Sequence, residues 1–363
     1  MNDIPTIGGR PSTQSPSVAI VLVNWNGWRD SIACIRSCLA LSGTGFRIIL
    51  CDNDSGDGSV ERILAWARSE EEAEPDPASP VAIAAPRLPH GVALLDRAAA
   101  ERGDDADGAE LILVRTGGNL GFAGGNNVGL RWAMAQGCDY AWLLNNDTVV
   151  PPDALSTLIA TMEADRSIGV AGSLLLEYHS PDLVQACAGA LDRTTFRGRH
   201  LGPGVPLADR ERVEALIGGA DLRPSEILYP VGASMLVSRT FLDDVGLMEE
   251  SYFLYYEESD WVLRAAPRYR VGIVPDSHVY HRHGASAGTT PEGTSARSVG
   301  FLYRSRLRIA RRFAPARLPQ VVLGMLIDAA KGLARGRTAK ARAAASALTG
   351  RVHVPISANG NKA

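Results

Sequence analysis

The chain has 363 residues, of which 45% are apolar and 21% charged, and its 37 basic and 40 acidic residues give a net charge of −3. This composition is typical of a globular protein with one large or two modest domains, and it excludes collagen, a coiled coil and global disorder. No run of 18 predominantly apolar residues occurs, so we expect no transmembrane helix. Residues 1–17 lack the apolar core of a secretory signal, and we expect a disordered leader there.

The near-neutral net charge conceals two segments of opposite sign. Residues 69–108 carry ten acidic and three basic residues, a net charge of −7, and residues 304–351 carry twelve basic residues and one acidic residue, a net charge of +11. We expect the acidic segment to be a surface insertion with one edge strand near residues 92–95. The basic segment is expected to form helices over residues 301–351, followed by a disordered tail at 352–363.

Strands and helices alternate through the first half of the chain. Four short apolar runs are typical of strands buried on both faces, at residues 18–23, 46–51, 111–114 and 140–144. Helical spacing follows them, at residues 30–41, 60–69, 128–136 and from 151 onward. This order predicts a doubly wound α/β fold with a mostly parallel sheet. Beyond residue 165 we expect strands at 227–237 and 271–274, with a surface excursion over 193–226.

Polar clusters stand where three of these strands end. They are Asp52-Asn53-Asp54, a Gly/Asn loop at residues 119–127, and Asn145-Asn146-Asp147. Ligands of open parallel sheets bind beyond the carboxyl ends of the strands, and a carboxylate-lined site suits a diphosphate only with a divalent metal. Each cluster alone is also compatible with a turn. The first strand is followed neither by G-x-G-x-x-G nor by a P-loop, which argues against a dehydrogenase or a P-loop enzyme.

A second set of titratable residues lies further along. Glu257, Glu258 and Asp260 crowd into an aromatic setting, which raises the pKa of a carboxyl group and makes it a better base near neutral pH. The alternative is the exposed face of an amphipathic helix. His281 and His283 follow a strand-like segment, where a histidine can complete a metal site.

Six segments, in this order, resemble the family 2 glycosyltransferases: VAIVLVNWNG, CDNDSGDGS, GGNLGFAGGNN, WLLNNDT, GASMLVSRTFLDDVGLMEESYFLYYEESDWVLRA and VYHRHGAS. They look most like the rhamnosyltransferase-type branch, which also resembles galactofuranosyltransferases, and the match covers about residues 18–312. The resemblance implies a GT-A fold, Rossmann-like and nucleotide-sugar-binding, over residues 18–300. It also implies Mg²⁺ or Mn²⁺ as cofactor and inversion at the anomeric carbon by direct displacement.

The resemblance further implies donor-side roles. Asp52 would hold the nucleotide base, accompanied by Asp54, and Asn24 and Asn26 would line the nucleotide pocket. The loop residues along the donor would be Asn119, Gly121, Phe122, Gly124, Gly125 and Asn126. Asn145-Asn146-Asp147 occupies the D-x-D position with asparagine in place of the first acid, so Asp147 alone would carry the metal contact there.

His281 aligns with the metal-binding histidine of the family, with His283 as the fallback. Glu258 stands where the family has its base, and the glutamate in place of the usual aspartate adds one methylene to its reach. Glu257, Asp260 and Trp261 are expected on the acceptor side, and Arg304 is expected to face the diphosphate.

These roles predict an inverting, metal-dependent transferase that moves rhamnose from dTDP-rhamnose to a hydroxyl of a cell-surface glycan or polyprenyl-linked acceptor. Galactofuranosyl or other hexosyl transfer is the alternative within the family. From other classes, a sugar nucleotidyltransferase would need a basic Gly-rich loop after the first strand, which residues 24–28 lack. A non-catalytic binding protein of the same fold is the remaining alternative.

The five cysteines are odd in number and lack zinc-site spacing, which favours reduced thiols in a cytoplasmic protein.

The basic tail indicates where the protein acts. An interfacial helix on the anionic inner face of the plasma membrane is expected, with an apolar face of Val321, Val322, Met325, Leu326 and Ala329. Its charged side would be Lys331, Arg335, Arg337, Lys340 and Arg342. The alternative is a helix packed on the domain; no motif supports nucleic-acid binding.

Overall fold

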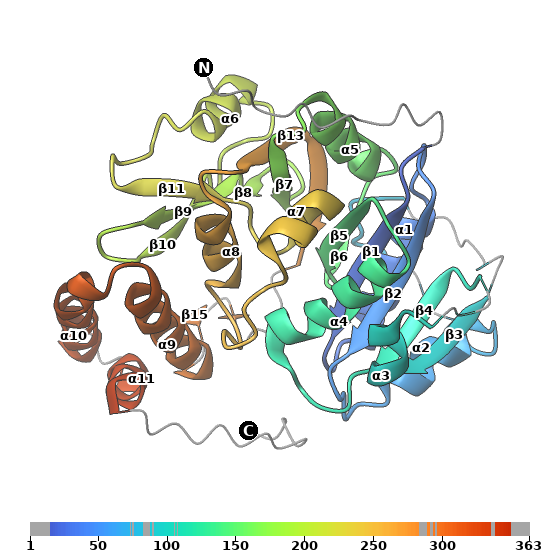
Figure 1. The fold of residues 1–363 in the computed structure, drawn as a ribbon, viewed down its shortest axis with the longest axis horizontal. Coiled ribbons are helices and arrows are strands. Elements are labelled where there is room, and N and C mark those ends of the chain that lie inside the picture. Colours follow the sequence, from blue (N-terminus) through green and yellow to red (C-terminus); the bar gives the residue numbers. More distant parts are fainter. Residues whose placement is uncertain are drawn as a thin grey trace.

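The computed structural model describes residues 15–72, 74, 76–82, 88, 91–104, 106, 108–282, 289–290, 293–294, 296–334 and 338–349. Most of the predicted leader, His283, Arg335, Arg337 and the predicted tail lie outside these residues. Strands and helices alternate through the first part of the chain (Figure 1). These elements are β1 (Val18–Asn24), α1 (Trp28–Leu39), β2 (Phe46–Asp52), α2 (Ser59–Ala67), β3 (Val92–Asp96), α3 (Arg97–Arg102), β4 (Leu111–Arg115), α4 (Gly121–Ala135) and β5 (Tyr140–Asn145).

The second part of the chain completes the sheet and adds a smaller sheet and three C-terminal helices. Its strands are β6 (Thr148–Val149), β7 (Ile168–Glu177), β8 (Val184–Ala186), β9 (Ala188–Asp192), β10 (Gly198–Leu201), β11 (Glu226–Tyr229), β12 (Ser234–Ser238), β13 (Arg270–His281), β14 (Thr289–Thr290) and β15 (Gly293–Thr294). Its helices are α5 (Ala154–Ala164), α6 (Arg210–Ile217), α7 (Arg239–Val245), α8 (Glu257–Ala265), α9 (Ala296–Phe313), α10 (Leu318–Ala334) and α11 (Thr338–Thr349), with a 3₁₀ turn at Pro315–Arg317.

The main sheet has ten strands within the described residues, in the order β3-β4-β2-β1-β5-β12-β7-β13-β6, with β8 paired to β7. The first five of these are mutually parallel, and β12 is antiparallel to both β5 and β7. Strands β7 and β13 therefore run in the same direction as β5. The carboxyl ends of β1, β2, β4, β5, β7 and β13 consequently lie along one side of the sheet, which we call the carboxyl edge. The predicted α/β fold with a mostly parallel sheet is confirmed.

Helices cover both faces of this sheet (Figure 1). Ile20 and Leu22 of β1 pack in the core shared with α1, α2 and α5, whereas Ala19 and Val21 pack in the core shared with α4, α7 and α8. Both faces of β1 are thus buried, which explains why the strand appears as a continuous apolar run. Gly129 lets helix α4 approach β1 closely: a Cβ at this position would lie only 2.4 Å from Val21 Cγ1.

Two expectations about individual segments are corrected, and a third is confirmed. The predicted Gly/Asn loop at 119–127 is helical from Gly121 onward, because its small residues let this turn pack against the sheet. The predicted strand at 227–237 is two strands of different sheets, β11 and β12, separated by a turn that contains Pro230. The edge strand expected near residues 92–95 is confirmed: β3 forms the edge of the main sheet beside β4, and α3 follows it directly.

The three C-terminal helices form a separate apolar cluster with the small sheet β10-β9-β11. Val321 and Met325 of α10 are fully buried in it, and each such side chain contributes about 2 kcal/mol to stability. The prediction that this apolar face lies on a membrane is therefore wrong, because Val321 and Met325 at its centre pack inward. Among the residues that the structure describes, none of the helices has the length and apolarity needed to cross a bilayer.

Candidate active site

A buried hydrogen-bond network joins the ends of β1, β2 and β5. Asn24 Nδ2 donates to Asp52 Oδ1 at 2.7 Å, and the Ser55 hydroxyl donates to the same oxygen at 2.6 Å. Asn146 Nδ2 donates to Asn24 Oδ1 at 3.1 Å and to Ser31 Oγ at 2.9 Å. The carboxylate of Asp52 is thus held in one orientation, with only 3% of the residue exposed. Asn146 belongs to this network and does not face His281.

Two residues at the rim of this network adopt left-handed backbone conformations. Asn26 has φ 55° and Asp54 has φ 62°, values that asparagine and aspartate tolerate better than other non-glycine residues. Asn26 Oδ1 accepts the N–H of Gly56 at 2.8 Å, while its own N–H donates to Ser55 Oγ at 2.8 Å. The turns after β1 and β2 therefore hold each other in place, and both Asn26 and Asp54 are exposed beside Asp52.

The segment Asn119–Asn126, which we call the donor loop, docks against the end of β2 and against Phe253. Asn53 Nδ2 donates to the Gly121 carbonyl at 2.9 Å, and the Phe122 N–H donates to the Phe253 carbonyl at 2.9 Å. Gly121 has φ 72°, and a Cβ there would lie 2.3 Å from Phe253 O. Only glycine fits both the conformation and the space.

Not every residue of the donor loop is placed to touch a ligand. A Cβ on Gly124 would meet Leu120 at 2.7 Å, and one on Gly125 would meet Asn53 and Val23 at 2.9 Å. Asn126 is 2% exposed and donates to the Phe122 carbonyl. Gly124 and Gly125 therefore have no room for a side chain, and Asn126 is buried within the loop.

Asp147 and His281 meet at the carboxyl edge although 134 positions separate them in sequence. Strand β13 pairs with β6, which places His281 opposite Thr148 and beside Asp147. His281 Nε2 lies 3.2 Å from Asp147 Oδ1, and Asn145 Nδ2 lies 3.4 Å from the same nitrogen. The structure thus brings together the two residues that the resemblance implies as metal ligands.

Gln185 of β8 fixes the orientation of the His281 ring. Its Nε2 donates to the His281 carbonyl at 3.0 Å and to Glu177 Oε2 at 3.3 Å, two groups that accept hydrogen bonds. Gln185 Oε1 therefore faces the ring, 2.6 Å from Nδ1, so Nδ1 carries the proton and donates. Nε2 is turned toward Asp147, where it carries either a second proton or a lone pair for a metal ion. The sequence signal for Gln185 was a lone polar residue inside an apolar run.

The Asp147 carboxylate needs a positive charge beside it, which either a proton on His281 or a metal cation can supply. Burial lowers the pKa of the His281 imidazole, but the Asp147 carboxylate and its hydrogen bond raise it more, so the net shift is upward. One carboxylate and one imidazole with its other nitrogen anchored suit Mn²⁺ or Mg²⁺. Among the described residues, no group of three or more His, Cys, Asp or Glu side chains could hold a metal. Donor phosphate oxygens would therefore have to complete the coordination.

Glu257 and Glu258 begin helix α8, after two tyrosines with unusual backbone geometry. Tyr255 and Tyr256 have φ 70° and 74°, which aromatic residues rarely adopt, and the Tyr256 hydroxyl anchors the turn by donating to the Phe196 carbonyl at 2.8 Å. Glu257 is 2% exposed, and its Oε2 has no hydrogen-bond partner within the described structure. Burial, together with the neighbouring Glu258, raises the pKa of Glu257 well above its ordinary range.

Glu258 is less buried, and both it and Phe122 of the donor loop lie near Gly232. A Cβ on Gly232, which precedes β12, would lie 3.2 Å from Glu258 Oε1 and 3.2 Å from Phe122 Cζ. Burial raises the pKa of Glu258 to about 7, although the backbone N–H of Gly232 partly offsets this effect. Such a carboxyl group accepts and releases a proton near neutral pH, which is the property of a general base.

Asp260 and Trp261 are interior residues, which corrects their expected place on the acceptor side. Asp260 is fully buried and accepts from Arg264 Nε at 2.7 Å and from Arg312 Nη1 at 3.0 Å. Trp261 is 1% exposed, and its Nε1 donates to the Gly246 carbonyl at 2.8 Å. Their positions in the first turns of α8 place them on its inner face, so both stabilise the helix that carries Glu258.

Arg304 of α9 lies next to the residues that support the donor loop. Phe301 stacks on Phe253 with ring centroids 4.6 Å apart, and the Arg304 guanidinium lies 5.9 Å from the Phe301 ring. Burial and the nearby Arg308 lower the pKa of Arg304. Arg304 forms no ion pair with any acid that the structure describes, so its guanidinium remains available for an anion.

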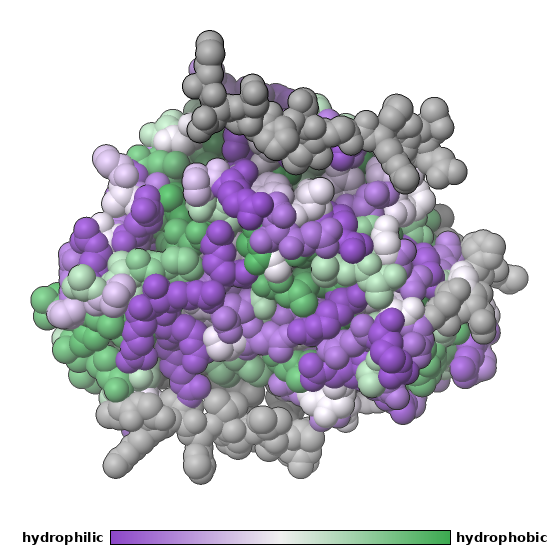
Figure 2. Space-filling view, in the orientation of Figure 1, coloured by the Kyte–Doolittle hydropathy of each residue, from purple (hydrophilic) through white to green (hydrophobic). Residues whose placement is uncertain are grey.

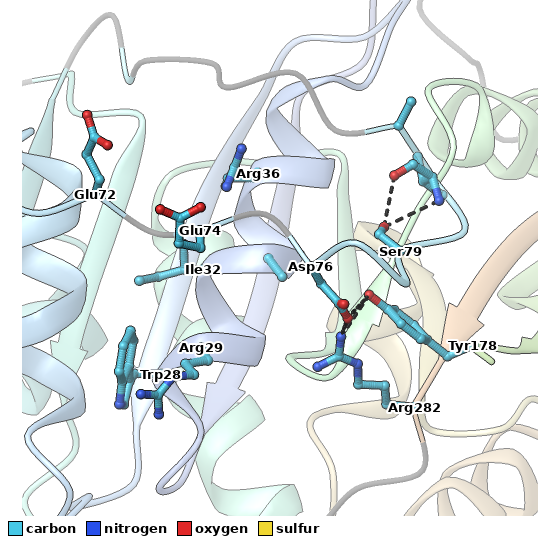
Figure 3. A pocket seen from close by; sticks show the side chains of 13 residues that line it. Trp28, Arg29, Ile32, Arg36, Glu72, Glu74, Asp76, Ser79, Tyr178 and Arg282 are labelled. Atoms are coloured by element: carbon cyan, nitrogen blue, oxygen red, sulfur yellow. Dashed lines mark hydrogen bonds and ion pairs between the residues drawn. The ribbon is translucent and has the colours of Figure 1, made fainter.

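Arg282, which the sequence analysis missed, ties this site to the acidic segment. Its N–H donates to the Asp147 carbonyl at 3.0 Å, and its guanidinium donates to Asp30 of α1 at 2.8 Å and to the Tyr178 hydroxyl at 2.8 Å. It also forms an ion pair with Asp76 of the acidic segment. Arg282, Tyr178 and Asp76 line one side of a pocket of about 730 Å³ between α1 and the acidic segment (Figure 3). The acidic segment thus helps to hold the end of β13, beside His281.

Comparisons with known proteins agree with this geometry. The family model "Glycosyl transferase family 2" matches residues 93–205. The chain is 24% identical over 157 residues to a protein of Haloferax volcanii named "Low-salt glycan biosynthesis hexosyltransferase Agl10", a match that covers 43% of the chain and 46% of that protein. It is 22% identical over 180 residues to the "dTDP-rhamnosyl transferase RfbF" of Shigella flexneri, which covers 49% of the chain and 54% of that protein.

The chain thus spans about half the length of these curated relatives. Among solved structures, it is similar to a mannosyltransferase from Pyrobaculum calidifontis in complex with GDP-Man and Mn²⁺, with a TM-score of 0.51 and 14% identity over 95% of the chain and 78% of that protein. At this identity the structural likeness shows the fold alone. The predicted resemblance to the family 2 glycosyltransferases and the GT-A fold are both confirmed, with the family model matching residues 93–205.

Proposed function

We propose that this protein transfers a sugar from a nucleotide donor to an acceptor hydroxyl, with inversion at the anomeric carbon. The observation that carries the proposal is the position of Glu258, a carboxyl group with a pKa of about 7 beside Gly232 and Phe122 of the donor loop. A single displacement needs one base and no protein nucleophile, and the carboxyl edge offers such a base next to the predicted donor site.

The chemical step is a direct substitution. The acceptor hydroxyl gives its proton to Glu258 while its oxygen forms a bond to the anomeric carbon of the donor sugar. The bond between that carbon and the diphosphate oxygen breaks, and the nucleoside diphosphate leaves with the electron pair. Positioning of the two reactants and stabilisation of the leaving charge supply most of the acceleration.

The donor side follows from the hydrogen-bond network and the charged residues. Asp52, oriented by Asn24 and Ser55, receives the nucleotide base, and Asp147 with His281 would hold Mg²⁺ or Mn²⁺. When bound, such a cation neutralises the charge of the leaving diphosphate. Arg304 supplies further positive charge from α9.

The favoured donor is dTDP-rhamnose. The Shigella flexneri relative is named a dTDP-rhamnosyl transferase, and this supports rhamnosyl transfer. The Haloferax volcanii relative is named a hexosyltransferase, which supports galactofuranosyl or other hexosyl transfer as the second candidate. The acceptor is a cell-surface glycan or a polyprenyl-linked glycan, reached from the cytoplasmic side of the membrane.

A panel of nucleotide sugars tested by thermal shift with Mn²⁺ examines this proposal. A donor that binds only the folded protein at 100 times its dissociation constant raises the stability by about 2.7 kcal/mol. We expect dTDP-rhamnose to give the largest Mn²⁺-dependent shift, and EDTA to remove it. A larger shift with UDP-galactofuranose would select the second candidate. Binding of a donor without transfer to any glycan acceptor would favour a non-catalytic binding protein.

A further inference from the structure

Helix α10 has an apolar side that the described chain leaves uncovered. Its inner side packs against α9 and α11 through Val321, Met325 and Ala329. On the outer side, four large apolar side chains are exposed by 58%, 49%, 44% and 53%, namely Leu323, Leu326, Ile327 and Leu333. Within the described residues, the other exposed large apolar side chains are Leu94 and Leu183, and both are less exposed than these four, at 40% and 36%.

The outer side of α10 is mostly apolar. With 3.6 residues per turn, Gln320 and Lys331 are the polar residues on the side opposite Met325. The apolar residues of this side are Pro319, Leu323, Leu326, Ile327, Ala330 and Ala334, with Leu333 at its border. We call this set the outer face of α10. Figure 2 shows hydrophobic residues at the left edge of the molecule, where Figure 1 places α10. A cluster of large apolar side chains on the surface is typical of an interaction site.

A basic residue lies at each end of the outer face. Arg317 directly precedes α10, Lys331 lies in its last turn, and both are exposed. Neither forms an ion pair with an acid that the structure describes, and the same holds for Arg308, Arg311 and Arg342. The single acid of residues 304–351, Asp328, is taken by Arg197 and Arg306. Both ends of the outer face therefore carry a positive charge that no described acid compensates.

We propose that the outer face of α10 docks onto an anionic membrane surface. The helix, about 25 Å long, would lie in the plane of the interface with Leu323, Ile327 and Leu333 among the acyl chains. Arg317 and Lys331 would lie at the level of the lipid phosphates. This goes beyond the proposed function, because sugar transfer as described uses no residue of the outer face.

A membrane explains the outer face better than a second copy of the chain. A symmetric dimer through this face would bring the same surface of both copies together. Arg317 and Lys331 of one copy would then lie near those of the other, without acidic partners on the face to compensate them. Anionic lipid headgroups supply that compensation.

Flotation of the full-length protein with lipid vesicles tests the proposal. We expect binding to phosphatidylcholine vesicles that contain phosphatidylglycerol at low salt, and much weaker binding to phosphatidylcholine alone. The triple variant Leu323→Ser, Leu326→Ser, Ile327→Ser should bind the anionic vesicles at least about tenfold more weakly. The control Leu94→Ser removes an exposed leucine from β3, far along the chain from α10, and should bind like the wild type. Replacing Arg317 and Lys331 by glutamine should weaken binding about tenfold.

The outcomes are distinguishable from each other and from the proposed function. Circular dichroism checks that the variants fold, and flotation requires no donor or acceptor. Failure of the wild-type protein to bind either vesicle, or unchanged binding by the triple variant, would overturn the proposal. A dimer in light scattering that the triple variant converts to a monomer would assign the outer face to a second copy instead.

Discussion

Asp147 and Glu258 are both carboxyl groups at the carboxyl edge, but their neighbours give them opposite tasks. Asp147 faces His281, whose pKa it raises, so this side of the site is built around a positive charge. Glu258 lies beside a second carboxyl group in a buried setting, and the pKa values of both are raised. The comparison teaches that the partner, and not the residue type, decides whether a carboxylate attracts a cation or accepts a proton.

The largest expected effect comes from removing the proposed base. Glu258→Gln should lower the rate of transfer by on the order of 10²–10⁴ and leave donor binding nearly unchanged, because only proton transfer is lost. Glu257→Gln is the matched control, since the raised pKa keeps Glu257 protonated and an amide replaces a neutral group. Transfer assays and donor titrations separate the two. Equal losses in both variants would remove the distinction between the two glutamates.

The second-largest effect is expected from replacing Asp147, the proposed metal ligand. Asp147→Asn should abolish the Mn²⁺-dependent part of donor binding, because the pair with His281 loses its only carboxylate. Calorimetric titration of the donor with and without EDTA measures the metal-dependent part of the affinity. The control is Asp153→Asn, an exposed carboxylate nearby in the chain, which should leave the metal dependence as in the wild type. Metal-dependent binding that persists in Asp147→Asn would place the cation elsewhere.

A smaller effect is expected from the residue that orients His281. Gln185→Leu removes the acceptor for Nδ1, and the affinity for Mn²⁺ should fall by about 10- to 100-fold. Gln185→Glu keeps an acceptor at this position and should restore most of the affinity. Electron paramagnetic resonance of free Mn²⁺, in the presence of dTDP, reports this without an activity measurement. Unchanged affinity in Gln185→Leu would show that the ring needs no such anchor.

The raised pKa of Glu258 also predicts how stability depends on pH. Its folded-state pKa of about 7 lies above the ordinary value of 4.5, so the folded protein binds the proton more tightly than the unfolded chain. This contribution to stability is complete below pH 4.5 and is lost as the pH rises through 7. Glu258→Gln should therefore be more stable than the wild type at pH 8 by about 1–3 kcal/mol, and nearly equal at about pH 4.5. Urea unfolding at both pH values measures the difference, and a constant difference would contradict the raised pKa.

The smallest effect concerns the support beneath the site. Gly129→Ala places a methyl group 2.4 Å from Val21 Cγ1 and should destabilise the fold by about 1–3 kcal/mol. Gly300→Ala in α9 is the matched control, since no atom lies within 4 Å of its added Cβ, and it should stabilise the protein by up to about 1 kcal/mol. Thermal unfolding compares them. Equal stability of the two variants would show that α4 can move away from β1.

The sequence by itself determined the elements whose signal is local. The apolar runs around Val18 and Phe46 predicted buried parallel strands, and the polar residues after them predicted where a ligand binds, because both patterns depend on neighbours in the chain. The aromatic setting of Glu258 likewise predicted its raised pKa. The resemblance then supplied the pairing of Asp147 with His281, which spacing alone does not reveal.

Only the tertiary structure decided which side of each element faces the interior. Asp260 and Trp261 share the segment of Glu258, yet they point inward, because α8 turns them toward Arg312 and Gly246. Gln185 and Arg282 meet the site through strand pairing and ion pairs across long stretches of chain. Helix α10 is apolar on both sides, so its sequence could not tell which side packs; contacts with α9 and α11 bury Met325 and leave the outer face exposed.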